Sequence, residues 1–135
     1  MYYLFFLKDE IQDIGLPESK ILINLCGENI LNPYRRWSSE LQKDIFDSRI
    51  QTTKTLMRAI QNSEYLPEVY IGVSGVSYYK PDLSIEQDEH TNQPDNSIWY
   101  ELCNEIETEA IKSAEAANVR CVVVRSGKNK LNCLI

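Results

Sequence analysis

Residues that commonly bind metals are scarce in this sequence of 135 residues, which holds one histidine and four cysteines. The cysteines stand at positions 26, 103, 121 and 133 and form no Cys-x-x-Cys pair. A structural zinc site needs four ligands at characteristic spacings, so no metal site is expected. The acidic run from Glu86 to His90 is expected to be solvated. Free thiols at this spacing predict an intracellular, reducing compartment, namely the cytoplasm or nucleus, with an organelle as a further alternative.

Basic residues and long apolar runs are also few. The chain has 14 lysines and arginines against 20 acids, a net charge of −6, and no basic stripe. Nucleic-acid binding, which depends on such a stripe, is therefore not expected. The apolar segment Met1–Leu7 lacks a basic leading region and is too short to cross a membrane, so we expect neither a targeting signal nor a membrane span. A hydrophobic content of 43% predicts one globular domain over residues 1–135.

Hydrophobic periodicity predicts an alternation of strands and helices. Two continuous apolar runs indicate strands buried on both faces, and two longer segments repeat every 3.6 residues, as amphipathic helices do. The expected elements are a strand over Lys20–Cys26, a helix over Ser38–Asn62, a strand over Glu68–Ser74, a helix over 98–118 and a strand over Val119–Arg125. Ser39 and Gln42 have the spacing of a capping box, and Asp95–Ser97 can cap the second helix.

This order predicts an α/β fold in which right-handed crossovers join parallel strands in a doubly wound sheet. Ligands of such sheets bind beyond the carboxyl ends of the strands. Here those ends are Cys26–Gly27, Ser74–Gly75 and Arg125–Gly127. The polar segment 75–96 is long enough to be a functional loop or lid.

Short motifs at these strand ends resemble a known family. The motifs are Asn24-Leu-Cys-Gly-Glu-Asn-Ile30, Arg36-Trp37, Ser48-Arg49, Ser74-Gly-Val-Ser-Tyr-Tyr79 and Val122-Val-Val-Arg-Ser-Gly127. Together, in this order, they resemble the epimerase-family atypical short-chain dehydrogenases/reductases. The resemblance implies an incomplete Rossmann-like sheet of about three parallel strands with two long helices, and a dinucleotide cofactor, NADP(H) or NAD(H).

The resemblance also implies roles for individual residues. Asn24, Leu25, Cys26 and Gly27 would pass along the adenosine half of the cofactor, with Cys26 in place of a smaller alanine. Asp44 and Arg49 would point towards the cofactor, although solvated charges on a helix face are an equal alternative. Ser74 would hydrogen-bond a substrate oxygen near the nicotinamide, beside Gly75 at the cofactor. The alternative for Ser74 is a hydroxyl that caps the strand end, and Tyr78 or Tyr79 could be loop aromatics that pack on the sheet.

Two features are missing, one of complete family members and one of most enzymes in the wider superfamily, which other members of this family also lack. The five glycines, at positions 15, 27, 72, 75 and 127, are too far apart for the Gly-rich loop that holds a pyrophosphate. The Tyr-x-x-x-Lys pair is also missing, because Tyr100 precedes Asn104 and Trp99 precedes Cys103 at that spacing. These gaps predict a protein truncated at both ends, with doubtful cofactor binding, weak or no activity, and an unassigned substrate.

The missing first strand has structural consequences too. Its loss would leave the strand over Lys20–Cys26 as an open edge, which predicts weak stability unless Met1–Leu7 folds back as a substitute strand. The alternative function is a non-catalytic interaction module. In that case the helix over Ser38–Asn62 and the open edge would pair with a second copy or with a full-length relative.

Overall fold

A computed structural model of the chain describes residues 16–30, 33–82, 84–91 and 94–127. Their elements are the strands β1 (Ile21–Asn24), β2 (Val69–Gly75) and β3 (Arg120–Ser126), the helices α2 (Ser39–Gln61) and α3 (Ile98–Ala116), and the 3-10 turn η1 (Val76–Tyr78). The predicted order of strands and helices is confirmed. Expectations that fall on Met1–Leu7 and on residues 128–135 lie outside the described residues.

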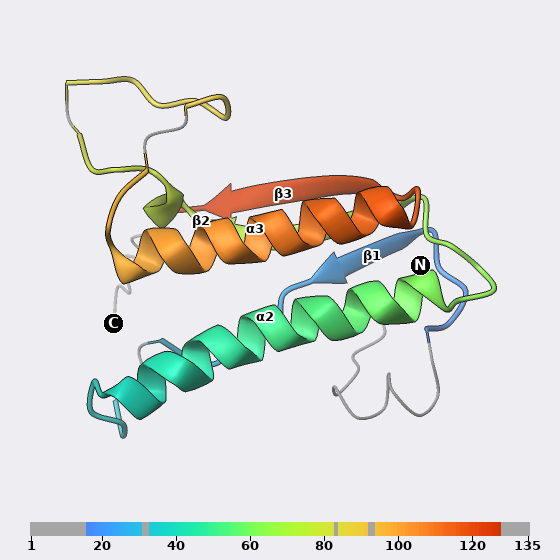
Figure 1. Cartoon of the computed structure of the whole chain (residues 1–135), viewed down its shortest axis with the longest axis horizontal. Helices are drawn as coiled ribbons and strands as arrows, with labels where there is room; N and C mark the ends of the chain where they lie inside the picture. The colour runs from blue at the N-terminus through green and yellow to red at the C-terminus, as the bar shows by residue number, and fades with distance from the viewer. Residues whose placement is uncertain (1–15, 31–32, 83, 92–93, 128–135) are drawn as a thin grey trace, which may run out of the picture.

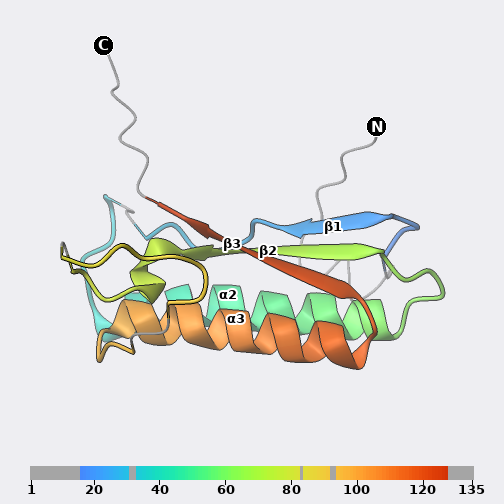
Figure 2. The same ribbon diagram turned by 90° about the horizontal axis from the view of Figure 1, so that it is seen from above.

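The three strands form one parallel sheet in the order β1-β2-β3. Ile23 pairs with Ile71, and Ile71 pairs with Val122. Both helices lie against the same face of this sheet (Figure 2). Each crossover moves one strand further in the same direction, so right-handed connections place both helices on one side. The predicted α/β sheet with about three parallel strands and two long helices is confirmed.

The opposite face of the sheet is open among the described residues. Ile21 and Ile23 on β1 are 56% and 54% exposed, and Val124 on β3 is 45% exposed. The expectation that the strand over Lys20–Cys26 is buried on both faces is therefore wrong for this part of the chain. The continuous apolar run shows that both faces can be buried, whereas burial itself needs a second layer, which the described residues do not supply.

Both helices begin with a serine cap. The Ser38 hydroxyl accepts a hydrogen bond from the backbone N–H of Leu41 at 3.3 Å, so the cap is one residue before the predicted Ser39. The Ser97 hydroxyl accepts from the N–H of Tyr100 at 3.2 Å, as expected. Such caps satisfy N–H groups that the helix itself leaves unpaired. Figure 1 shows that both helix N-termini lie at the end of the molecule where the strands finish.

The core lies between the helices and the sheet and consists of two clusters. The larger contains Leu56, Met57, Ile60, Tyr70, Ala110, Ala114 and Val119. The other contains Leu41, Ile45, Ile50, Leu102 and Ile106. The small side chains of Ala110 and Ala114 are almost fully buried and let α3 approach the sheet closely. Among the described residues, no helix is long and apolar enough to span a membrane.

Candidate functional site

A cavity of about 480 Å³ lies at the carboxyl ends of the strands, where the sequence places the site. Its apolar wall is formed by Leu25, Ile30, Val73, Val76, Trp99, Leu102 and Ile106. Its polar groups are Arg49, the hydroxyls of Ser74, Ser77 and Ser126, and the thiols of Cys26 and Cys103, with Gly75 and Gly127 at the strand ends. An apolar hollow with a few polar groups is typical of a small-molecule site.

Ser74 is the polar group in this cavity that has no partner. Its side chain is buried, with 7% of the residue exposed, and its hydroxyl makes no hydrogen bond within the structure. Its backbone carbonyl accepts a hydrogen bond from the Ser126 hydroxyl at 3.1 Å, which ties β2 to β3 at their ends. Buried polar groups in native proteins are nearly always hydrogen-bonded, so the unpaired hydroxyl of Ser74 is unusual, and it belongs to a residue that lines the cavity.

Arg49 extends from α2 beneath the loop that follows β1. Its guanidinium donates to the backbone carbonyl of Glu28 at 3.0 Å and to that of Ile45 at 3.3 Å. Burial lowers the pKa of this guanidinium, although an arginine stays charged at neutral pH. Arg49 is therefore not the solvated helix charge of the alternative interpretation. The guanidinium has five N–H donors, so donors remain for a ligand in the cavity.

Gly27 permits this close approach of Arg49. A Cβ atom at position 27 would lie 2.6 Å from the guanidinium carbon, which is shorter than any normal contact. The Ser48 hydroxyl also accepts a hydrogen bond from the N–H of Glu28 at 2.9 Å. The Ser48-Arg49 motif thus fixes the loop after β1, and the space beside Gly27 is filled by an arginine of this chain.

Asn24 is buried at the end of β1 and connects three elements. Its amide donates to the Tyr70 hydroxyl on β2 at 3.1 Å and to the Thr53 hydroxyl on α2 at 3.3 Å. Its carbonyl oxygen accepts from the N–H of Cys26 at 3.1 Å. This side chain is committed to the core and does not line the cavity, whereas Leu25 and Cys26 do.

Asp44 lies apart from the other predicted site residues. Its carboxylate pairs with Arg35 at 2.7 Å, and its side chain is 51% exposed. It is not among the residues that line the cavity. The structure therefore brings together Leu25, Cys26, Arg49, Ser74 and Gly75, and leaves Asp44 on the surface of α2.

Sequence reasoning missed an ion pair behind the cavity. The Glu107 carboxylate, 6% exposed, pairs with Arg125 at 2.7 Å. Arg125 also lies 3.5 Å from the centre of the Tyr78 ring and donates to the Tyr79 hydroxyl at 2.9 Å. The hydrogen-bonded Glu107 raises the pKa of Arg125. The sequence did contain a signal for this ion pair, because Glu107 falls on the same buried face of α3 as Cys103 and Ala110 and therefore needs a partner of opposite charge.

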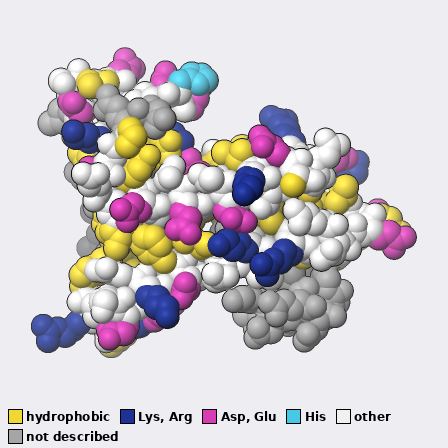
Figure 3. All heavy atoms as spheres, viewed as in Figure 1, with side chains coloured by type: hydrophobic (Ala, Val, Ile, Leu, Met, Phe, Trp, Pro, Cys, Tyr) yellow, Lys and Arg dark blue, Asp and Glu magenta, His cyan; other side chains and the backbone are white. Residues whose placement is uncertain are grey.

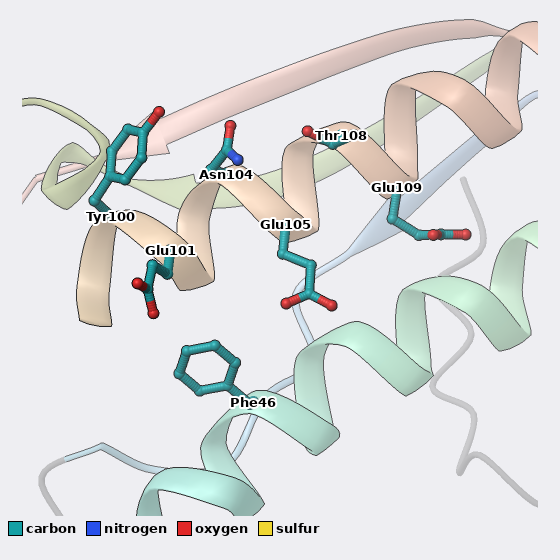
Figure 4. Close-up of a pocket in the computed structure, with 7 residues that line it drawn as sticks. All are labelled: Phe46, Tyr100, Glu101, Asn104, Glu105, Thr108 and Glu109. Atoms are coloured by element: carbon teal, nitrogen blue, oxygen red, sulfur yellow. The ribbon is translucent and has the colours of Figure 1, made fainter. Parts of the chain in front are cut away.

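The register of α3 decides which side chains face the cavity. Trp99 and Cys103 line it, whereas Tyr100 and Asn104 line a separate hollow on the outside of the helices (Figure 4). Neither pair supplies a phenol with an ammonium four residues later. The outer hollow also holds Glu101, Glu105 and Glu109. Figure 4 shows Glu101 and Glu105 directed towards α2, whereas Glu109 extends along α3.

Metal ligation has no support in the described residues. No three histidine, cysteine or acidic side chains come close enough to hold an ion. His90 lies in the loop that projects beyond the start of α3 (Figure 1) and is 3.8 Å from the Glu89 carboxylate. Figure 3 shows this histidine with acidic side chains at the edge of the molecule, away from the sheet.

Comparison with known proteins gives a consistent result. The chain is 41% identical over 119 residues to the epimerase family protein SDR39U1 of Bos taurus, covering 88% of this chain and 40% of that protein. It is also 41% identical over 68 residues to an epimerase family protein of Staphylococcus saprophyticus. The chain thus spans about two fifths of the length of the mammalian relatives it matches. It matches no profile of a known protein family.

Solved structures agree with this comparison. Human epimerase family protein SDR39U1, solved with NADPH, superposes with a TM-score of 0.78 at 39% identity, over 87% of this chain and 39% of that one. The UDP-glucuronic acid 4-epimerase of Bacillus cereus, solved with NAD, superposes with a TM-score of 0.62 at 15% identity, over 91% of this chain and 35% of that one. The second likeness concerns the fold alone.

Replacement of Asn24 should destabilise the protein. In Asn24→Ala the hydroxyls of Tyr70 and Thr53 lose a donor, and the N–H of Cys26 loses an acceptor. Unsatisfied buried groups cost ~1–3 kcal/mol, so we expect the free energy of unfolding to fall by about that amount in urea denaturation. Asn104→Ala, on the outer side of α3, is the control and should be neutral or slightly stabilising. Equal losses in the two variants would contradict the role given to Asn24.

Tyr70 should make stability depend on alkaline pH. Burial raises the pKa of its hydroxyl above the ordinary value, against a smaller opposing effect of the hydrogen bond from Asn24. The unfolded chain loses this proton near pH ~10, and the native state keeps it to higher pH, so the free energy of unfolding falls as pH rises through the native pKa. Tyr70→Phe should lose less stability over this range than the wild type. Tyr65→Phe, at an exposed position, should follow the wild type.

Proposed function

We propose that the chain forms part of an NAD(P)-dependent oxidoreductase- or epimerase-like site, because it is similar to epimerase family proteins over about two fifths of their length. The observation that supports this proposal is the buried, unpartnered hydroxyl of Ser74 in the strand-end cavity. The substrate is unassigned, and activity in this form is weak or absent.

The residues present fit the nicotinamide end of a dinucleotide better than its pyrophosphate. A nicotinamide, when bound, supplies or accepts a hydride. The apolar wall of Val73 and Trp99 would exclude water beside it. The Ser74 hydroxyl would hold the carboxamide oxygen of the nicotinamide when the nucleotide is bound alone, and a substrate oxygen in the complete complex. By contrast, the widely spaced glycines of the sequence provide no close backbone approach for phosphates. We therefore assign Ser74 and Gly75 to the nicotinamide end, and Leu25 and Cys26 to the wall of the cavity.

The groups usually used for proton transfer in this kind of site are not found in the cavity. Among the described residues that line it there is no tyrosine, lysine or carboxylate, and the thiols of Cys26 and Cys103 are its titratable groups besides Arg49. A serine hydroxyl with an ordinary environment orients an oxygen but is a poor acid on its own. This chemistry accords with a site that binds and orients its ligand while catalysing weakly.

A comparison of a whole cofactor with its half tests the proposal. Because the sequence has no Gly-rich loop for the pyrophosphate, the phosphates of NADPH should add little to its affinity. We therefore expect reduced nicotinamide mononucleotide and NADPH to bind with similar affinity, and with dissociation constants larger than micromolar. Fluorescence titration of the purified chain measures both. A micromolar dissociation constant for NADPH, with much weaker binding of the mononucleotide, would contradict the proposal that the cofactor site is incomplete.

Ser74→Ala separates this site from non-specific binding. The hydroxyl has no partner in the protein, so its removal should leave the unfolding temperature unchanged and weaken binding of the reduced mononucleotide. Ser84→Ala, in the exposed loop, is the matched control. If neither nucleotide binds, or if both variants bind as the wild type does, the proposed site is wrong.

An interaction module is the second candidate, and the open sheet face favours it. Ile21 and Ile23 on β1 and Val124 on β3 are exposed on this face, on the two strands that flank β2. The outer helix face offers less, because Glu101, Glu105 and Glu109 lie along α3 and would repel the same row in a second copy. Pairing with a second copy or with a longer relative would therefore use the sheet rather than α2.

Light scattering tests this pairing. We expect the chain to associate as its concentration rises, and Ile23→Lys to shift it towards the monomer, because a charge cannot be buried without a partner. Ile111→Lys, at an exposed position on α3, should leave the association unchanged. A wild-type chain that stays monomeric throughout, or an equal effect of both substitutions, would exclude pairing through the sheet.

The free cysteines also support a proposal about the cellular compartment. Cys26, Cys103 and Cys121 are free thiols in the described part of the chain, while Cys133 lies outside it. Thiols of this kind persist in reducing compartments. We propose that the protein lies inside the cell, in the cytoplasm or nucleus, with an organelle as the alternative.

A further inference from the structure

The charges around the strand-end cavity differ from those of the chain as a whole. The protein has a net charge of −6, yet Arg49 is the only formally charged side chain among the described residues that line the cavity. Its partners at hydrogen-bond distance are the backbone carbonyls of Glu28 and Ile45, which leave the positive charge unneutralised. An unneutralised guanidinium in an apolar hollow favours an anionic ligand.

No acid pairs with this charge. Burial lowers the pKa of Arg49, against smaller opposing effects of Cys103 and Glu28. No ion pair joins Glu28 and Arg49 among the described residues, and Glu28 does not line the cavity. The guanidinium is therefore partly buried at the cavity, and its bonds to two backbone carbonyls do not use all of its five N–H donors.

The rest of the cavity defines the body of the ligand. Val73, Trp99, Leu102 and Ile106 supply an apolar surface on several sides, and Ser74 supplies one unpartnered hydroxyl. A sugar, which carries many hydroxyls, would lose most of its hydrogen bonds to water against such a wall without replacement. A compact apolar body with one charged end and one further oxygen would not.

We infer that the cavity binds a small organic acid with an apolar body, whose carboxylate lies on Arg49 and whose carbonyl or hydroxyl oxygen lies on Ser74. Arg49 thus has a second function besides holding the loop after β1, and the acid is the substrate class. The inference rests on the proposed function only in naming the acid as substrate, because its binding is measured without cofactor.

Three probes with the same number of carbon atoms separate the two contacts. α-Oxooctanoate carries both groups, methyl hexyl ketone has a methyl group in place of the carboxylate, and octanoate lacks the keto oxygen. We expect α-oxooctanoate to bind at least ~10-fold more tightly than the ketone, as a charge-assisted contact should give, and more tightly than octanoate. Calorimetry with the full chain, supported by tryptophan fluorescence from Trp99, measures these affinities. Equal binding of the acid and the ketone would overturn the inference.

Variants assign the contacts to residues. Arg49→Met should abolish the preference for the acid over the ketone, and Arg49→Lys, which keeps the charge and is the milder change for the fold, should retain part of it. Arg58→Met, exposed on the same helix, is the control and should bind as the wild type does. Ser74→Ala should remove the preference for α-oxooctanoate over octanoate. An acid preference that survives in a folded Arg49→Met variant would overturn the assignment.

Two further results distinguish this inference from its alternatives. Inorganic phosphate supplies charge without an apolar body, so it should not compete at equal concentration, and competition would show a phosphate site instead. If reduced nicotinamide mononucleotide binds in a Ser74-dependent way and no acid does, the inference fails while the proposed function stands. If the acid binds and no nicotinamide nucleotide does, the proposed function fails and the ligand class stands.

Discussion

The hydrogen bonds of the Asn24 amide are the constraint on which the site depends. In the described part of the chain β1 is a short edge strand, and backbone pairing with β2 holds it there from one side only. The Asn24 side chain adds bonds to Tyr70 on the sheet and to Thr53 on α2, at the point where the strand ends. Because the amide nitrogen and oxygen are both engaged, its orientation is fixed. The bond from the N–H of Cys26 then turns the chain into the cavity wall.

Polar contacts from the helices fix the remaining sides of the cavity. Arg49 and Ser48 on α2 hold the loop after β1. Glu107 on α3 holds Arg125 at the end of β3, and Arg125 in turn holds the tyrosines after β2. A buried ion pair is costly unless its geometry is good, and here a bidentate contact and an aromatic face both compensate that cost. Against this background of engaged groups, the free hydroxyl of Ser74 is the exception.

Much of the fold could be predicted from the sequence because it depends on local patterns. The apolar period located both helices and all three strands, and Ser97 was recognised as a cap. Burial of the first strand on both faces was wrong, because an apolar run does not reveal whether a second layer is present. The role of Asn24 was also beyond prediction, since its partners lie 29 and 46 residues away in the sequence. Because Asn24 belongs to a motif that resembles the family, the sequence predicted that its side chain lies beside the cofactor, whereas it lies in the core.

The rotation of α3 bears most directly on chemistry. Neighbouring residues on a helix point about 100° apart, so either Trp99 and Cys103 or Tyr100 and Asn104 can face the cavity, but not both. Burial of Ala110 and Ala114 against the sheet and pairing of Glu107 with Arg125 fix that rotation. Trp99 and Cys103 face inwards as a result. An inward tryptophan adds apolar surface and no ionisable group, so the same rotation that completes the ligand cavity gives it the Cys103 thiol, and neither a phenol nor an ammonium, for proton transfer.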